Sequence, residues 1–116
     1  MADVLFLTTD LMFSSQVLGA AGALGQKLQL VASPADVAGK TTPDCRLALV
    51  DLTIAGPDLG GVVAAIRGVA PAARIVAFGP HVDEARLAAA QAAGCDLVLS
   101  RGQFHKQYAE LLRAIS

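Results

Sequence analysis

Five short apolar runs alternate with five amphipathic stretches along the 116 residues of this chain. Continuous apolar runs of four or five residues are typical of parallel strands that helices cover on both faces. The predicted strands are Val4–Leu7, Leu28–Ala32, Leu47–Val50, Ile75–Phe78 and Leu97–Leu99. The predicted helices are Leu11–Leu24, Pro34–Ala38, Gly60–Gly68, Asp83–Ala93 and Gln103–Ile115.

Local signals mark where these elements begin and end. Ser33 followed by Pro34 is an N-cap with proline at the first helical position. Gly25, Gly68 and Gly94 each follow a predicted helix, where a left-handed closing residue is favoured. Strict alternation of strand and helix predicts a doubly wound α/β fold, a flavodoxin-like three-layer sandwich. We expect one domain over residues 1–116, with five helices and five parallel strands in the order 2-1-3-4-5.

Composition excludes several classes of function. The net charge is −1, from 9 basic and 10 acidic side chains, which gives no electrostatic footprint for nucleic acid or an acidic membrane surface. No apolar stretch reaches the ~20 residues of a spanning helix, and Met1 runs directly into a strand without a secretory leader. Cys45 and Cys95 are expected to be small buried side chains rather than a disulfide. We therefore expect a cytoplasmic protein without a transition-metal site.

Candidate chemistry centres on Asp51, which ends the apolar run Leu47–Val50. Open α/β sheets place their ligands at the carboxyl ends of the strands, where the first and third strands part. The first strand ends in Thr8 and Thr9, and Asp10 is placed to cap the helix that follows. His81 and His105 have no nucleophile or carboxylate placed beside them by the sequence, so we expect no catalytic residues and no enzyme activity.

Two segments carry a resemblance to a known family. Pro43–Gly61, PDCRLALVDLTIAGPDLGG, resembles the segment around the phosphoacceptor of the CheY-like receiver domains of bacterial response regulators. Ala88–Gly102, AAAQAAGCDLVLSRG, resembles the family's fourth helix and fifth strand. The resemblance extends over the whole chain in element order and implies that Asp51 occupies the phosphoacceptor position.

The resemblance also implies what this chain lacks. The family's acidic pair, which holds Mg²⁺, falls on Thr8 and Thr9, and its phosphoryl-binding hydroxyl falls on Gly79. Its conserved lysine falls on Arg101, which with Gly79 is the candidate for sensing a phosphoryl group. Threonine hydroxyls do not replace two carboxylates for Mg²⁺, and only Asp51 with a turned-back Asp10 could hold the ion weakly.

These departures favour a stand-alone pseudo-receiver that acts by protein–protein interaction, with phosphorylation absent or weak and no cofactor. We expect Asp51 to pair with Arg101 across the crevice. One alternative is a phosphorylatable receiver, with Asp51 as acceptor, Mg²⁺ bound and a histidine kinase as partner. A second is a small-molecule-binding domain that uses the crevice around Thr8, Asp51, Gly79 and Arg101.

The first predicted helix suggests where a partner could bind. Its 14 residues include no charged side chain, whereas an outer helix on a sheet normally shows a charged face. We expect Phe13, Val17, Ala20 and Leu24 to face the core, leaving Met12 and Leu18 outside. This face could be a partner or homodimer interface, or simply an alanine-rich helix surface.

Overall fold

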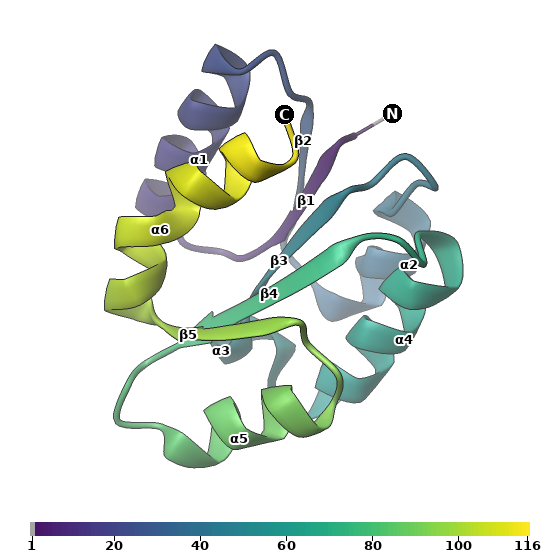
Figure 1. The fold of residues 1–116 in the computed structure, drawn as a ribbon. Helices are drawn as coiled ribbons and strands as arrows, with labels where there is room; N and C mark the ends of the chain where they lie inside the picture. The colour runs from purple at the N-terminus through teal and green to yellow at the C-terminus, as the bar shows by residue number, and fades with distance from the viewer. Residues whose placement is uncertain (1) are drawn as a thin grey trace.

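The computed structural model describes residues 2–116. Five parallel strands form one sheet in the order β2-β1-β3-β4-β5, which confirms the predicted topology (Figure 1). The strands are β1 (Val4–Leu7), β2 (Leu28–Val31), β3 (Leu47–Asp51), β4 (Arg74–Gly79) and β5 (Leu97–Ser100). β1 pairs with both β2 and β3, so the sheet order reverses between β1 and β3, and the carboxyl ends of these two strands lie side by side.

Helices cover both faces of the sheet (Figure 1). They are α1 (Leu11–Ala23), η1 (Pro34–Asp36), α2 (Val37–Lys40), α3 (Leu52–Ala55), η2 (Gly56–Asp58), α4 (Leu59–Val69), α5 (Glu84–Ala92) and α6 (Arg101–Ala114). α1 and α6 lie on one face, and α2, α4 and α5 lie on the other (Figure 1).

Alternate side chains of each strand fill the two layers of the core. Val4 and Phe6 of β1 face α1 and α6, whereas Leu5 and Leu7 face the other helices. Aromatic rings dominate the first layer, with Phe78 stacked on the Phe104 ring at 4.1 Å between centroids. Every residue of β1 and β3 is buried, which explains their uninterrupted apolar sequences.

Several element boundaries differ from the sequence-based prediction. Ser33 caps as expected, but the stretch after it is a 3₁₀ turn followed by α2, which runs to Lys40 instead of Ala38. Gly68 lies inside α4 and closes no helix, because α4 continues to Val69. Gly25 and Gly94 do have the positive φ expected of helix-closing residues.

Two further differences concern the strand ends. An additional helical turn, α3, follows Asp51 directly and is not among the predicted helices. α6 begins at Arg101 rather than Gln103, because Ser100 and Gln103 form a capping box: the Ser100 Oγ accepts the Gln103 N–H and the Gln103 Oε1 accepts the Ser100 N–H.

The outward face of α1 also differs in part from the prediction. Phe13 and Val17 are buried as expected, but Ala21 is buried in place of Leu24, which is 38% exposed. Leu24 is the C-cap residue, so it no longer follows the helical period that would turn it toward the sheet. Met12 and Leu18 are exposed, as predicted.

The window Leu52–Val69 is long and apolar enough to span a membrane, with a mean hydropathy of 1.3. It comprises α3, η2 and α4, and α4 buries Leu59, Val62, Val63 and Ile66 in the core. These four side chains of the window pack on the sheet. Cys45 and Cys95 are free thiols, the first buried and the second half-buried, and burial raises the pKa of both.

Candidate functional site

Asp51 lies at the carboxyl end of β3, beside the end of β1. Its side chain is 2% exposed, and both carboxylate oxygens accept hydrogen bonds. The Thr8 hydroxyl donates to Oδ2 at 2.8 Å, and the Thr53 backbone N–H donates to Oδ1 at 3.0 Å. Asp51 thus caps the N-terminus of α3 and joins it to the end of β1.

Thr8 and Thr9 differ in role although they are adjacent. Thr8 is 1% exposed, and its hydroxyl also accepts the Asp10 backbone N–H at 3.1 Å. Thr9 is exposed. The Thr8 hydroxyl thus accepts from a backbone group and donates its proton to the buried carboxylate of Asp51. Two side chains distant in sequence are joined because parallel strands end at one edge of the sheet.

Arg101 does not pair with Asp51, so that prediction is wrong. Its guanidinium donates to Asp10 Oδ2 at 3.1 Å and lies 5.6 Å above the centroid of the Phe13 ring. Arg101 begins α6 and Asp10 caps α1, and these two helices pack side by side on the same face of the sheet. Their N-termini are therefore neighbours, and Arg101 turns toward α1.

Asp10 fulfils its predicted capping role and forms the ion pair in addition. Its Oδ1 accepts the Phe13 backbone N–H at 3.0 Å. That hydrogen bond, together with the Arg101 guanidinium, holds the pKa of the Asp10 carboxyl below its ordinary value against the opposing effect of desolvation. The carboxylate is thus committed to α1 and Arg101, which leaves it poorly placed to serve Asp51 as a second metal ligand.

Gly79 ends β4 at the same edge and is buried. A Cβ atom at this position would lie 3.3 Å from both the Cβ and the Cδ1 of Leu52, which is closer than ordinary van der Waals contact. The side chain of Leu52 therefore occupies the space beside this strand end. No hydroxyl is available at this position to hold a phosphoryl oxygen.

Arg86 of α5 is a residue near this edge that the sequence analysis missed. Its Nη1 lies 3.4 Å from the Leu52 carbonyl oxygen, and its Nε pairs with Asp83 at 3.1 Å. The sequence signal that could have identified Arg86 is a basic residue in the first turn of the helix that follows the fourth strand. His81 is exposed in that loop, and His105 is exposed on α6 beside Phe13.

The residues at this edge do not fit a magnesium ion. Within residues 2–116, no group of three or more His, Cys, Asp or Glu side chains is placed to hold a metal. Mg²⁺ requires near-octahedral oxygen coordination with one or two carboxylates and dehydrates reluctantly. Of the two described carboxylates that follow β1 and β3, Asp10 is engaged by Arg101 and the Phe13 N–H, and Asp51 is 2% exposed with one protein hydrogen bond to each oxygen.

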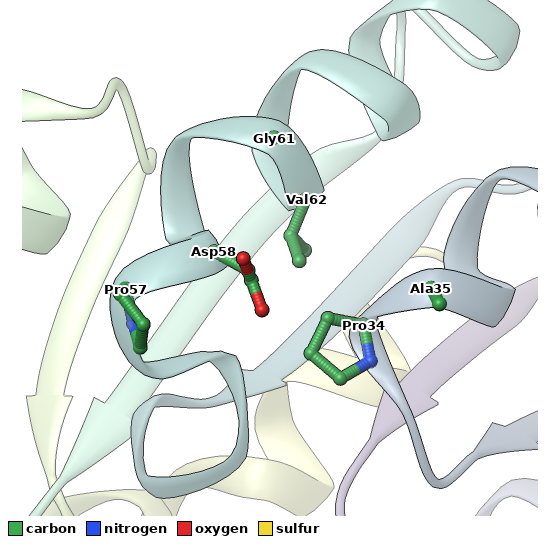
Figure 2. A pocket seen from close by; sticks show the side chains of 6 residues that line it. All are labelled: Pro34, Ala35, Pro57, Asp58, Gly61 and Val62. Atoms are coloured by element: carbon green, nitrogen blue, oxygen red, sulfur yellow. The ribbon is translucent and has the colours of Figure 1, made fainter.

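A hollow of about 380 Å³ lies next to this edge, between η1 and the start of α4 (Figure 2). It is lined by Pro34, Ala35, Pro57, Asp58, Gly61 and Val62. Figure 2 shows the Asp58 carboxylate directed into the space between the two segments. With one acid and no base in its lining, the hollow does not favour an anionic ligand. Thr8, Asp51 and Gly79 are all buried, so they too offer little surface to a small molecule.

Comparison with known proteins supports the fold, but it does not establish a function. No protein-family model matches the chain, and no curated protein matches it. Among solved structures, 80 chains are similar. The beryllofluoride-activated DrrB receiver domain has a TM-score of 0.79 and 10% identity, over 99% of this chain and 97% of its own.

Two further solved structures have the same fold. A two-component response regulator from Clostridium difficile gives a TM-score of 0.77 at 19% identity, over 99% of this chain and 95% of that one. A CheY-like protein, TadZ, from Pseudomonas aeruginosa gives 0.71 at 16% identity, with both chains covered completely. The chain therefore has the fold of CheY-like response-regulator receiver domains, as its two quoted segments indicated.

Proposed function

We propose that this chain is a pseudo-receiver that acts in bacterial signal transduction by binding a protein partner, such as a histidine kinase or another signalling protein. The observation that carries the proposal is the state of Asp51. Its carboxylate is 2% exposed, and each oxygen accepts a hydrogen bond from the protein itself. An acceptor of phosphoryl groups needs an oxygen that the phosphoryl donor can reach, and the Asp51 carboxylate is buried.

Charge supports the same proposal. Attack of a carboxylate on a phosphoryl group brings two negative charges together, and catalysis consists mainly of positioning and neutralising them. Here the acidic pair that would hold Mg²⁺ is replaced by Thr8 and Thr9, and Arg101 neutralises Asp10. Phosphorylation of Asp51 is therefore absent or very slow. The domain binds its partner without being regulated by phosphorylation.

The experiment measures a covalent adduct and thermal stability in parallel. The purified chain is incubated with Mg²⁺ and acetyl phosphate and weighed by intact-protein mass spectrometry. Its melting temperature is recorded with Mg²⁺, alone and with beryllofluoride. We expect no phosphoryl adduct and no thermal shift, either in the wild type or in Asp51→Asn.

A variant that restores the acidic pair provides the positive control. Thr8→Asp combined with Thr9→Asp adds two carboxylates at the end of β1, of which the one at position 8 lies beside Asp51, where like charges destabilise the fold until a cation binds. We expect this variant, unlike the wild type, to gain stability with Mg²⁺. A wild-type adduct that Asp51→Asn abolishes would instead establish the phosphorylatable receiver.

That phosphorylatable receiver is the second candidate, and the place of Asp51 favours it. The residue ends β3 at the carboxyl edge of the sheet, where open α/β sheets carry their chemistry. For it to work, Thr8 would have to release Oδ2 and Asp10 would have to leave Arg101. The mass measurement separates the two candidates directly.

A further inference from the structure

α3 is a single helical turn that directly follows the carboxyl end of β3. It consists of Leu52–Ala55, and a backbone hydrogen bond from the Gly56 N–H to the Leu52 carbonyl oxygen closes it. A turn of this length is not stable by itself in water, because fixing its backbone costs more free energy than one hydrogen bond returns. The position of α3 therefore depends on its contacts with the rest of the chain.

Two contacts attach the start of α3 to the ends of the strands. The Thr53 backbone N–H donates to Asp51 Oδ1 at 3.0 Å. Leu52 is buried and lies so close to Gly79, at the end of β4, that a Cβ atom there would be 3.3 Å from it. α3 thus supplies one of the two hydrogen bonds to the Asp51 carboxylate. If α3 moves away from the strand ends, Asp51 Oδ1 loses that donor.

Arg86 of α5 provides a third attachment, and it acts on the carbonyl that closes the turn. Its Nη1 donates to the Leu52 carbonyl oxygen at 3.4 Å, and the same oxygen accepts the Gly56 N–H. Its Nε pairs with Asp83 at 3.1 Å, and Asp83 also accepts the Arg86 backbone N–H. Asp83 therefore orients the guanidinium, and the guanidinium connects α5 to α3. The Arg86 side chain is 46% exposed, so this attachment lies at the surface.

The composition of α3 is that of a segment with low local stability. Only Leu52 and Ala55 are buried among its four residues, whereas Thr53 is exposed and Ile54 is half-buried. Gly56 follows with a φ of 50°, in the region that glycine adopts most readily. Segments with few buried apolar contacts and exposed backbone open locally at a lower free energy than the whole domain unfolds.

We propose that α3 is a lid on Asp51 that opens without unfolding of the domain, and that Arg86 is the strap that holds it closed. In the closed state, Thr8 and Thr53 each donate to the buried carboxylate. In the open state, Oδ1 is released and solvent reaches Asp51. This inference rests on the proposed function, in which burial keeps Asp51 from accepting a phosphoryl group, and it adds what maintains that burial.

The test measures opening by thiol labelling, read site by site with peptide mass spectrometry. Leu52→Cys, in a Cys95→Ala background, places a thiol on α3 at a buried position, and the buried Cys45 is the internal reference. When closing is faster than labelling, the labelling rate is proportional to the open population. We expect the thiol of Leu52→Cys to react at least about tenfold faster than Cys45. Its rate should be nearly independent of urea below the unfolding transition, whereas the Cys45 rate should rise with urea because it requires global unfolding.

Arg86→Met, added to the same background, tests the strap. It removes the donor to the Leu52 carbonyl and should raise the labelling rate of Leu52→Cys about two- to tenfold, the factor expected for one hydrogen bond. Arg113→Met is the matched control. Arg113 also pairs with an acidic residue three positions earlier, Glu110, but it lies on α6 at the opposite face of the sheet. This control should leave the labelling rate of Leu52→Cys unchanged.

Ala55→Cys reports on the other end of α3 and keeps the test decisive if Leu52→Cys does not fold. Labelling on α3 that rises with urea as steeply as that of Cys45 would overturn the lid, because α3 would then open only with the whole domain. An unchanged rate in Arg86→Met would overturn the strap. The labelling involves no phosphoryl group, so its outcome is separate from that of the acetyl phosphate experiment, where an adduct on Asp51 would overturn the proposed function instead.

Discussion

Removing the Thr8 hydroxyl should destabilise the protein far more than the same change at Thr9. Thr8→Val keeps the shape of the side chain but removes its hydrogen bond to Asp51 Oδ2 and the acceptor of the Asp10 N–H. Asp51 is 2% exposed, so water cannot readily replace the lost donor. A hydrogen bond to a charged group contributes about 1.5–3 kcal/mol, and a buried group left unsatisfied costs a similar amount.

We therefore expect Thr8→Val to lower the free energy of unfolding by about 2–3 kcal/mol. For a domain of this size, 1 kcal/mol corresponds to about 4 °C, so the melting temperature should fall by about 8–12 °C. Urea denaturation followed by circular dichroism gives the free energy, and a thermal scan gives the midpoint.

Thr9→Val is the control, because Thr9 is the next residue and is exposed. It should change the free energy of unfolding by less than about 0.5 kcal/mol. A double-mutant cycle with Asp51→Asn then isolates the coupling between the two side chains, which should exceed about 0.5 kcal/mol. If Thr8→Val and Thr9→Val are equally mild, the Thr8–Asp51 hydrogen bond does not stabilise the site and Asp51 is more accessible than we infer.

Three further predictions follow from other contacts. The folded Asp10 carboxyl has a pKa below its ordinary 3.8, so its contribution to stability is complete above that pH and is lost as the pH falls through the folded pKa. The free energy of unfolding in urea should therefore depend less on pH between about pH 5 and 3 in Asp10→Asn than in the wild type. Arg101→Met should keep most of the wild-type pH dependence, because the Phe13 N–H is the largest cause of the shift. Arg67→Met removes hydrogen bonds to the Ala73 and Gly94 carbonyls and to Asp96 and should cost about 1–2 kcal/mol by denaturation, while Arg113→Met, which breaks an exposed pair with Glu110, should cost less than about 0.5 kcal/mol. Gly79→Ala should cost about 1–2 kcal/mol through overpacking against Leu52, and an unchanged or raised melting temperature would show that the strand end has room for a side chain.

The hydrogen bonds of Asp51 give this residue a role in the fold itself. A carboxylate that caps α3 and accepts the Thr8 hydroxyl has a structural role at the point where β1 and β3 diverge. That role requires no metal and no phosphoryl group. The resemblance to receiver domains implies a phosphoacceptor at this position, whereas the contacts of Asp51 are those of a structural side chain.

The sequence by itself determined the order and direction of the elements. Apolar runs such as Leu47–Val50 are too short for helices and too continuous for a half-exposed strand, so they predict a parallel sheet covered on both faces. Capping residues act locally, which is why the roles of Ser33 and Asp10 could be predicted from their neighbours. Boundaries were less well predicted, as at Gly68, because packing on the sheet can extend a helix past a glycine.

Only the tertiary structure decided how the candidate site is connected. The sequence predicted that Arg101 pairs with Asp51, but the packing of α6 beside α1 directs it to Asp10. The partner of Asp51 is 43 residues away in Thr8, and the neighbouring ends of β1 and β3 join the two. Local sequence determines which residue can cap a helix. A hydrogen bond between distant side chains depends instead on which strand ends and helix ends the whole fold brings together.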